Sequence, residues 1–140
     1  MPSKRLTDCV PWLGTAWMEI EEEYHRDHPG HRLDITCTYR SPDEQFGLFC
    51  TGRVKDANGV WIIDTDPKTS VVTNCDGKEI ISRHNTKPVE AIDFEVRIYG
   101  KISWDPREYE PVGILAEQRG LIWGGRWPHL RDYPHVELPK

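Results

Sequence analysis

The sequence predicts an α+β fold, in which a single compact domain has a small, mostly antiparallel sheet flanked by about three helices. Apolar residues recur every three or four positions in some segments, which is the period of a helix. Other segments are rich in β-formers and alternate, which is the period of a strand. No internal repeat, low-complexity stretch or linker interrupts the 140 residues, a length that suggests one domain.

The first helix is predicted in the N-terminal segment and ends before "HPGH", residues 28–31. Pro11 is expected near its start, because proline would break an interior turn. Spacings of three and four residues place the apolar positions on one face: Leu6, Val10, Leu13, Trp17, Ile20 and Tyr24.

A second helix is predicted over residues 42–51. Ser41 is a good N-cap, Pro42 suits the first helical position, and Glu44 completes a capping box. Gly52 is a typical stop signal.

The third helix is predicted from Asp105, as its cap, to Gly120, as its stop. Pro106 occupies the first helical position. Pro111 is expected to break or kink this helix, which leaves the continuous part after it.

The strands are predicted from alternation and turn signals. "LDITCTYR", residues 33–40, reads as a strand that leaves Arg40 at the junction with the second helix. Residues 53–81 are expected to form irregular connections with short strands. The remaining expected features are strand pieces in "WIID" (61–64) and "SVVT" (70–73), a hairpin at "YGK" (99–101), a loop at "LIWGGRW" (121–127) and a strand at "HVEL" (135–138).

Composition excludes two classes of function. The net charge of −5 argues against a nucleic-acid binder, which normally carries a basic patch. The mean hydropathy of −0.65 and the lack of any window near the ~20 apolar residues of a membrane span argue against membrane insertion. The N-terminus has no apolar signal region, so synthesis in the cytoplasm is expected.

The four cysteines form no C-x-x-C pair, so a cysteine-based zinc site is not expected. A cytoplasmic location favours free thiols, although a disulfide formed later in an oxidising place stays open. Cys37 lies in an apolar strand and is predicted to be a small core residue.

Three of the six histidines cluster as His25, His28 and His31. They could bind a metal, but a solvated helix end and turn is the favoured interpretation. His129 lies in the "RWPHLRDYPH" loop, where it could face solvent or substrate.

The segment "SRHNTKPVEAIDF", residues 82–94, places His84 on a loop and Asp93 on the polar face of the strand that follows. Imidazole and carboxylate groups suit zinc, and a catalytic zinc usually has three protein ligands and an open position. This spacing alone would also fit two surface residues. "DYPHVEL" adds His135 with Asp132 three residues before it, an arrangement in which the histidine holds a metal and the carboxylate moves protons.

Three blocks in this order resemble the zinc peptidases that include D-Ala-D-Ala carboxypeptidases, dipeptidases and the L-alanyl-D-glutamate endopeptidases of phage endolysins. "TYRSPDEQFGLFCTGR" is similar to the family segment in which Arg is followed by Ser and then Gln. "SRHNTKPVEAIDF" is similar to the Ser-x-His … Ala-x-Asp motif, and "WGGRWPHLRDYPHVEL" to the closing Trp-Gly-Gly … Asp-x-x-His motif. The blocks span residues 38–138.

The resemblance implies roles for seven residues. Three of them match the ligands of one zinc ion: His84, Asp93 and His135. Two match the catalytic residues, Asp132 as acid/base and Arg40 as the group that stabilises the oxyanion. Ser82 and Gln45 match positions that bind substrate.

The chain departs from many members of this family in three ways. The interval from His84 to Asp93 is nine residues, where many members have seven with a glycine between, so the loop shape and the contacts of Lys87 are open. The longer loop, residues 86–88, is therefore the first place to look for substrate selectivity. Val136 replaces a frequent Phe, and the acidic net charge is atypical for a small lysin.

The resemblance implies a zinc-dependent peptidase, with residues 1–140 forming one catalytic domain and no separate wall-binding domain. The favoured function is an L-alanyl-D-glutamate endopeptidase, an endolysin that cleaves the stem peptide of peptidoglycan. It would be a monomer made in the host cytoplasm, and it would act on the wall after release through a holin. A D-Ala-D-Ala carboxypeptidase or dipeptidase, and a non-catalytic zinc-containing binding module, remain as alternatives.

Overall fold

A computed structural model describes residues 1–64 and 70–140. Its helices are α1 (Pro11–Asp27), α2 (Pro42–Cys50) and α3 (Pro106–Gln118), with three 3-10 turns, η1 (Leu6–Asp8), η2 (Arg83–Asn85) and η3 (Gly124–Arg126). The strands are β1 (His31–Cys37), β2 (Arg53–Lys55), β3 (Trp61–Ile63), β4 (Ala91–Ile98), β5 (Lys101–Ser103), β6 (Ile122–Trp123) and β7 (His135–Glu137). The predicted α+β class is therefore confirmed.

The main sheet is built around β4. One edge of β4 pairs with β1, from His31 opposite Ile98 to Cys37 opposite Asp93. The other edge pairs with β7 near the start of β4 and with β5 near its end, and β6 extends the sheet beyond β7. All these pairings are antiparallel, as predicted.

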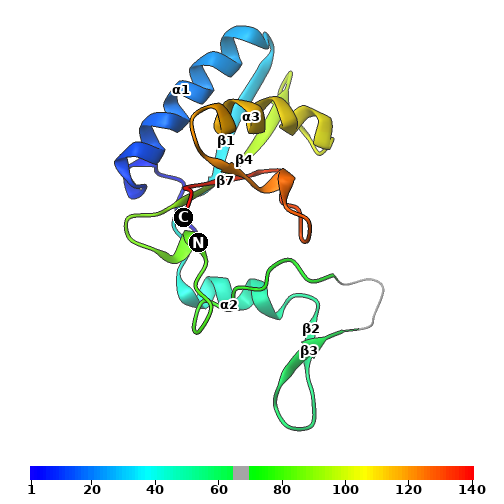
Figure 1. Ribbon diagram of the computed structural model, residues 1–140. Coiled ribbons are helices and arrows are strands. Elements are labelled where there is room, and N and C mark those ends of the chain that lie inside the picture. Colours follow the sequence, from blue (N-terminus) through cyan, green and yellow to red (C-terminus); the bar gives the residue numbers. More distant parts are fainter. Residues whose placement is uncertain (65–69) are drawn as a thin grey trace.

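Helices α1 and α3 cover one face of this sheet (Figure 1). The Phe94 ring lies 5.1 Å from that of Trp17 on α1 and 5.6 Å from that of Tyr109 on α3. The predicted apolar face of α1 is confirmed for Leu13, Trp17, Ile20 and Tyr24, which are buried. Because α1 begins at Pro11, Leu6 lies in η1 and Val10 is the N-cap, and both pack against the core from outside the helix. Since strand residues alternate between faces, Asp93 is directed away from this core.

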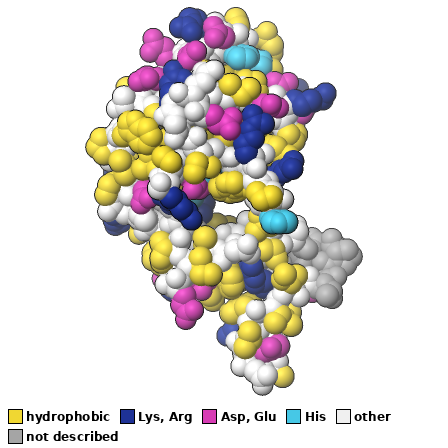
Figure 2. Space-filling view, in the orientation of Figure 1, with side chains coloured by type: hydrophobic (Ala, Val, Ile, Leu, Met, Phe, Trp, Pro, Cys, Tyr) yellow, Lys and Arg dark blue, Asp and Glu magenta, His cyan; other side chains and the backbone are white. Residues whose placement is uncertain are grey.

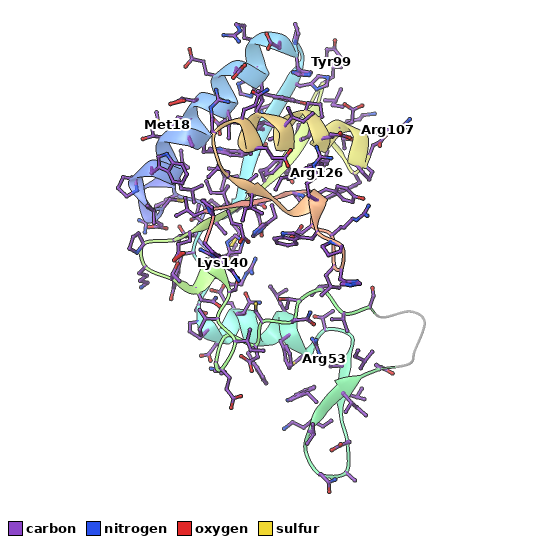
Figure 3. All side chains as sticks on the ribbon, viewed as in Figure 1. Met18, Arg53, Tyr99, Arg107, Arg126 and Lys140 are labelled. Carbon is purple, nitrogen blue, oxygen red and sulfur yellow. The ribbon has the colours of Figure 1, made fainter. Side chains whose placement is uncertain are left out.

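Helix α2 and the β2–β3 hairpin form a separate part of the molecule, below the open face of the main sheet in Figure 1. Between the two parts lies a groove of about 840 Å³, and Figure 2 shows the surface hollowed there. In Figure 3, Arg53 belongs to the lower part and Arg126 to the upper part. None of the helices in the described ranges is long and apolar enough to cross a membrane.

Helix α2 agrees with its prediction in detail. Ser41 is the N-cap, and its side chain accepts a hydrogen bond from the Glu44 N–H while the Glu44 carboxylate accepts one from the Ser41 N–H. Gly52 has a φ of +78°, the left-handed conformation that favours glycine after a helix. The hairpin predicted at "YGK" is also confirmed, with Tyr99 and Gly100 between β4 and β5.

The strand predicted for residues 33–40 is shifted. It begins at His31 and ends at Cys37, because the next backbone groups bond elsewhere. The Thr38 N–H donates to the Ser3 carbonyl, and the Arg40 N–H donates to the His84 carbonyl. These bonds tie the end of β1 to the N-terminal segment and to η2.

Three further predictions need correction. Helix α3 is one helix from Pro106 to Gln118, so the expected break at Pro111 is wrong; core packing of Tyr109 and Val112, on either side of Pro111, favours the continuous helix. Residues 70–73 form no strand; side chains bond the polar groups of Thr73, with Arg53 donating to its carbonyl. The expected loop at 121–127 contains β6 and η3.

Two helical glycines provide a matched test of the packing. A Cβ on Gly113 of α3 would lie 2.2 Å from the buried Trp123 ring, whereas a Cβ on Gly47 of α2 would meet nothing within 4 Å. We expect Gly113→Ala to lower the free energy of unfolding by about 1–3 kcal/mol through overpacking. Gly47→Ala should raise it by about 0.5–1 kcal/mol, because alanine loses less backbone entropy. Urea unfolding measures both, and a stabilised Gly113→Ala variant would contradict this packing.

Candidate metal and catalytic site

Asp93 is the centre of the candidate site, on the open face of β4. Its Oδ1 lies 3.1 Å from His84 Nε2 and 2.9 Å from His135 Nδ1. These two imidazole nitrogens are 3.4 Å apart. His84 and His135 are buried, so three potential ligand atoms from η2, β4 and β7 converge on one point.

The geometry of these three atoms fits zinc. Zinc bonds of about 2.0–2.1 Å in a tetrahedron place neighbouring ligand atoms about 3.3 Å apart. The separations among His84, Asp93 and His135 are 2.9 to 3.4 Å. Two imidazoles and one carboxylate also leave a fourth position open, which is the donor set of a catalytic site.

Hydrogen bonds orient both imidazoles. The Nδ1 of His84 lies 2.7 Å from the Thr38 carbonyl oxygen, to which it donates, so Nε2 faces Asp93. The Nε2 of His135 lies 2.8 Å from the Glu137 carboxylate, so Nδ1 faces Asp93. Such partners set which ring nitrogen is free for a metal.

Glu137 was not identified from the sequence. It lies two residues after His135 on the same strand, so the two side chains share one face of the sheet. This spacing in the sequence could have predicted that Glu137 lies beside His135. Its carboxylate is also 3.7 Å from Arg83, whose guanidinium contacts Glu90 as well. The orientation of His135 therefore depends on a network that ends outside the site.

Cys37 is a second residue that the sequence placed only in the core. It is buried, and it forms a possible ligand group with His84 and Asp93, with the ligand atoms within 4.8 Å of one another. Its sulfur lies 3.7 Å from His84 Nδ1, the nitrogen that bonds Thr38 and not the one that faces Asp93. We therefore place Cys37 on the Nδ1 side of the His84 ring, away from Asp93, and do not count it among the metal ligands with His135.

The charges of this cluster perturb the pKa values of its members. Burial lowers the pKa of His84, but the charge of Asp93 and its hydrogen bond outweigh burial and raise the pKa to about 10. Burial also lowers the pKa of His135, and hydrogen bonds to Asp93 and Glu137 raise it to about 9. Burial raises the pKa of Asp93, yet the His84 charge and the imidazole hydrogen bonds hold it well below its usual range.

Asp132 lies beside this cluster, with its Oδ2 3.8 Å from His135 Nδ1. Its side chain is 43% exposed and lines the groove, so it can meet a bound molecule. Burial and the nearby negative charge of Asp93 raise the pKa of Asp132. A carboxylate with a raised pKa is suited to accept and return a proton.

The "WGG" segment positions Asp132. The Asp132 N–H donates to the Gly124 carbonyl at 3.0 Å, and the Trp123 indole donates to the Tyr133 carbonyl at 2.8 Å. A Cβ on Gly124 would lie 2.3 Å from the Asp132 carbonyl oxygen, so only glycine permits this close approach. The Trp127 ring lies 5.0 Å from that of His135 and forms part of the groove wall.

Arg40 reaches the same site from the β1–α2 junction. Its Nη2 donates to Asp93 Oδ2 at 3.3 Å, and its Nη1 donates to Gln45 Oε1 at 2.9 Å. Gln45 is only 1% exposed, and its amide nitrogen donates to the Cys75 carbonyl. Although Gln45 lines the groove, its polar atoms hold Arg40 and the 70–81 segment.

Ser82 also lines the groove and caps η2. Its hydroxyl accepts from the His84 N–H at 3.2 Å, and its own N–H donates to the Asn85 side chain. Its main structural contribution is therefore to fix the turn that carries His84.

The longer interval between His84 and Asp93 lies away from the groove. Thr86 bonds the carbonyl oxygens of Arg83 and Pro88, and Lys87 lies over the Tyr39 ring at 4.6 Å. Lys87 and Pro88 line a separate hollow of about 340 Å³ beside the N-terminal segment. Selectivity from residues 86–88 is therefore not supported by their position.

The remaining histidines are accounted for. Tyr24 stacks on His28 and bonds His31 through its hydroxyl, while the Leu33 N–H donates to His25. Within residues 1–64 and 70–140, none of these three histidines belongs to a group of possible metal ligands. His129 is exposed and lines the groove, so it faces both solvent and any bound molecule.

Comparisons with known proteins agree with this geometry. A peptidase M15 family model described as D-alanyl-D-alanine carboxypeptidase matches residues 75–138, which include His84, Asp93, Asp132 and His135. The chain is 35% identical over 119 residues to the peptidoglycan L-alanyl-D-glutamate endopeptidase CwlK of Bacillus subtilis (strain 168). That match covers 76% of this chain and 61% of the relative, so the chain spans about three fifths of the relative's length.

A solved structure shares the fold. The crystal structure of the Serratia marcescens L-Ala D-Glu endopeptidase ChiX matches with a TM-score of 0.61 and 21% identity, over 96% of this chain and 83% of that one. The family model, the relative and the shared fold agree with the three motifs in the sequence. The chain is thus similar in sequence to the D-Ala-D-Ala carboxypeptidase family and to one L-alanyl-D-glutamate endopeptidase, and similar in fold to a second such endopeptidase.

Proposed function

We propose that this protein is a zinc-dependent peptidoglycan peptidase that cleaves the bond between L-Ala and D-Glu in the stem peptide. The observation that supports it most directly is the convergence of His84 Nε2, Asp93 Oδ1 and His135 Nδ1 beside Asp132. The two relatives named above are both L-Ala-D-Glu endopeptidases, which favours this bond over others.

In this proposal His84, Asp93 and His135 hold one zinc ion, which would polarise the scissile carbonyl and acidify a water molecule. Asp132 takes a proton from the attacking water and later delivers it to the leaving amine, a transfer that its raised pKa favours. Arg40, anchored by Gln45, presents positive charge to the developing oxyanion. Gln45 and Ser82 contribute to the substrate groove by holding Arg40 and His84 in place.

We further propose that the protein acts as a phage-type endolysin, made in the host cytoplasm and released to the wall through a holin. The support is the resemblance of the three sequence motifs to a family that includes the L-alanyl-D-glutamate endopeptidases of phage endolysins. We expect bacterial cells that express this protein together with a holin to lyse. Cells that express the protein without a holin should not lyse.

Zinc binding by the metal-free protein should release protons. With pKa values of about 10 and 9, His84 and His135 are protonated at pH 7.5, and metal binding requires their neutral forms. We expect one zinc per chain, about two protons released on binding, and an affinity that rises from pH 6 to pH 9. Calorimetry in buffers of different ionisation enthalpy measures the release.

Substitutions separate the ligands from the rest of the groove. His84→Ala and His135→Ala should each lose tight zinc binding, whereas His129→Ala, a change of an exposed histidine in the same groove, should keep it. Tight binding in both ligand variants would refute the proposed metal site.

Asp132→Asn should keep the zinc and lose hydrolysis by about 10²–10⁴-fold, because the amide cannot accept the proton. Zinc content and the rate of peptide cleavage are measured on the same sample. Unchanged hydrolysis by Asp132→Asn would show that another group transfers the proton. Hydrolysis by the wild type would exclude the alternative of a non-catalytic binding module.

The cleaved bond distinguishes the two enzymatic candidates. A D-Ala-D-Ala carboxypeptidase has the same proposed chemistry, and the description of the matching family model favours it as the second candidate. Mass spectrometry of digested peptidoglycan should show new N-terminal D-Glu. Released D-Ala without new D-Glu termini would instead identify the carboxypeptidase.

A further inference from the structure

The groove has a charge balance opposite to that of the whole chain. Its described lining contains four cationic side chains and three carboxylates, which is a formal balance of +1, whereas the chain carries −5. The four cations are Arg40, Arg83, Arg131 and Lys140. A groove of this sign favours a ligand that carries a carboxylate.

Arg131 differs from the other arginines of the groove. Arg40 and Arg83 form ion pairs with carboxylates of the protein. Arg131 is exposed, and across residues 1–64 and 70–140 it has no carboxylate partner; its Nε donates to the Trp127 carbonyl at 3.0 Å. That bond holds the guanidinium while Nη1 and Nη2 remain available to bind the two oxygens of one carboxylate.

Arg131 lies next to the residue proposed to transfer the proton. It directly precedes Asp132, the residue proposed to protonate the leaving amine, and both side chains line the same groove. When D-Glu is joined to the next residue through its side-chain carboxyl, its other carboxyl is free. That free group sits on the carbon that carries the leaving nitrogen.

We propose that Arg131 forms a subsite for this free carboxylate and thereby selects glutamate on the leaving-group side of the cleaved bond. The proposal rests on the L-Ala–D-Glu cleavage proposed above. It assigns to Arg131 a role in binding the substrate and no role in proton transfer. Its loss should therefore raise KM and leave kcat nearly unchanged.

The test uses two soluble peptidoglycan fragments, each with L-Ala-γ-D-Glu-L-Lys, that differ only in whether the free carboxyl of D-Glu is a carboxylate or a carboxamide. The wild type should cleave the carboxylate form with a kcat/KM about tenfold higher, the effect of one charge-assisted hydrogen-bonding pair at an exposed site. Arg131→Gln should cleave both forms equally. Arg131→Glu should reverse the preference, because the two carboxylates repel each other.

Arg126→Gln is the matched control, because Arg126 is a half-exposed arginine on the α3 side of the molecule, paired with Glu110 and Glu117 (Figure 3). This variant should keep the wild-type preference. Equal cleavage of both fragments by the wild type, or an unchanged preference in Arg131→Gln, would overturn the subsite. Failure of the wild type to produce N-terminal D-Glu from any substrate would instead overturn the proposed function.

Discussion

The carboxylate of Asp93 is the group on which the site depends. It lies on the central strand β4, whose neighbours on both edges fix its position, and it accepts from His84, His135 and Arg40. A buried carboxylate would be unfavourable without such partners. Burial raises the pKa of Asp132, and the charge of Asp93 adds to that rise; the same charge, acting against burial, raises the pKa values of the two histidines.

The alternation of β4 links the core to the chemistry. Ile92 and Phe94 point into the layer of α1 and α3, which leaves Asp93 on the open face. A shift of the register by one residue would exchange these faces. The apolar core therefore holds the potential ligand in place, although it contains none of the proposed catalytic residues.

The outer contacts of the imidazoles come from different parts of the chain. Thr38, at the end of β1, bonds His84, and Glu137 on β7 bonds His135. The orientation of the candidate ligands thus depends on three strands meeting in one sheet. The lower part of the molecule adds Gln45, which holds Arg40 over the site, and completes the groove that a substrate would enter.

Local signals in the sequence were sufficient for the helices, the capping box at Ser41 and the hairpin at Tyr99–Gly100, because periodicity, caps and turn residues are local properties. The grouping of His84, Asp93, Asp132 and His135 rested instead on the resemblance of three motifs to a known family, because spacing alone would also fit surface residues. Tertiary contacts decided the rest. They ended β1 at Cys37, kept α3 intact through Pro111, placed Cys37 on the Nδ1 side of the His84 ring, and directed residues 86–88 away from the groove. Partners distant in sequence take part in three of these outcomes: Ser3 bonds Thr38 after the end of β1, His84 contacts Cys37, and Tyr39 contacts Lys87. A short stretch of sequence does not determine which distant residue a backbone group or a charged side chain will bind. These partners come into contact only when the chain folds.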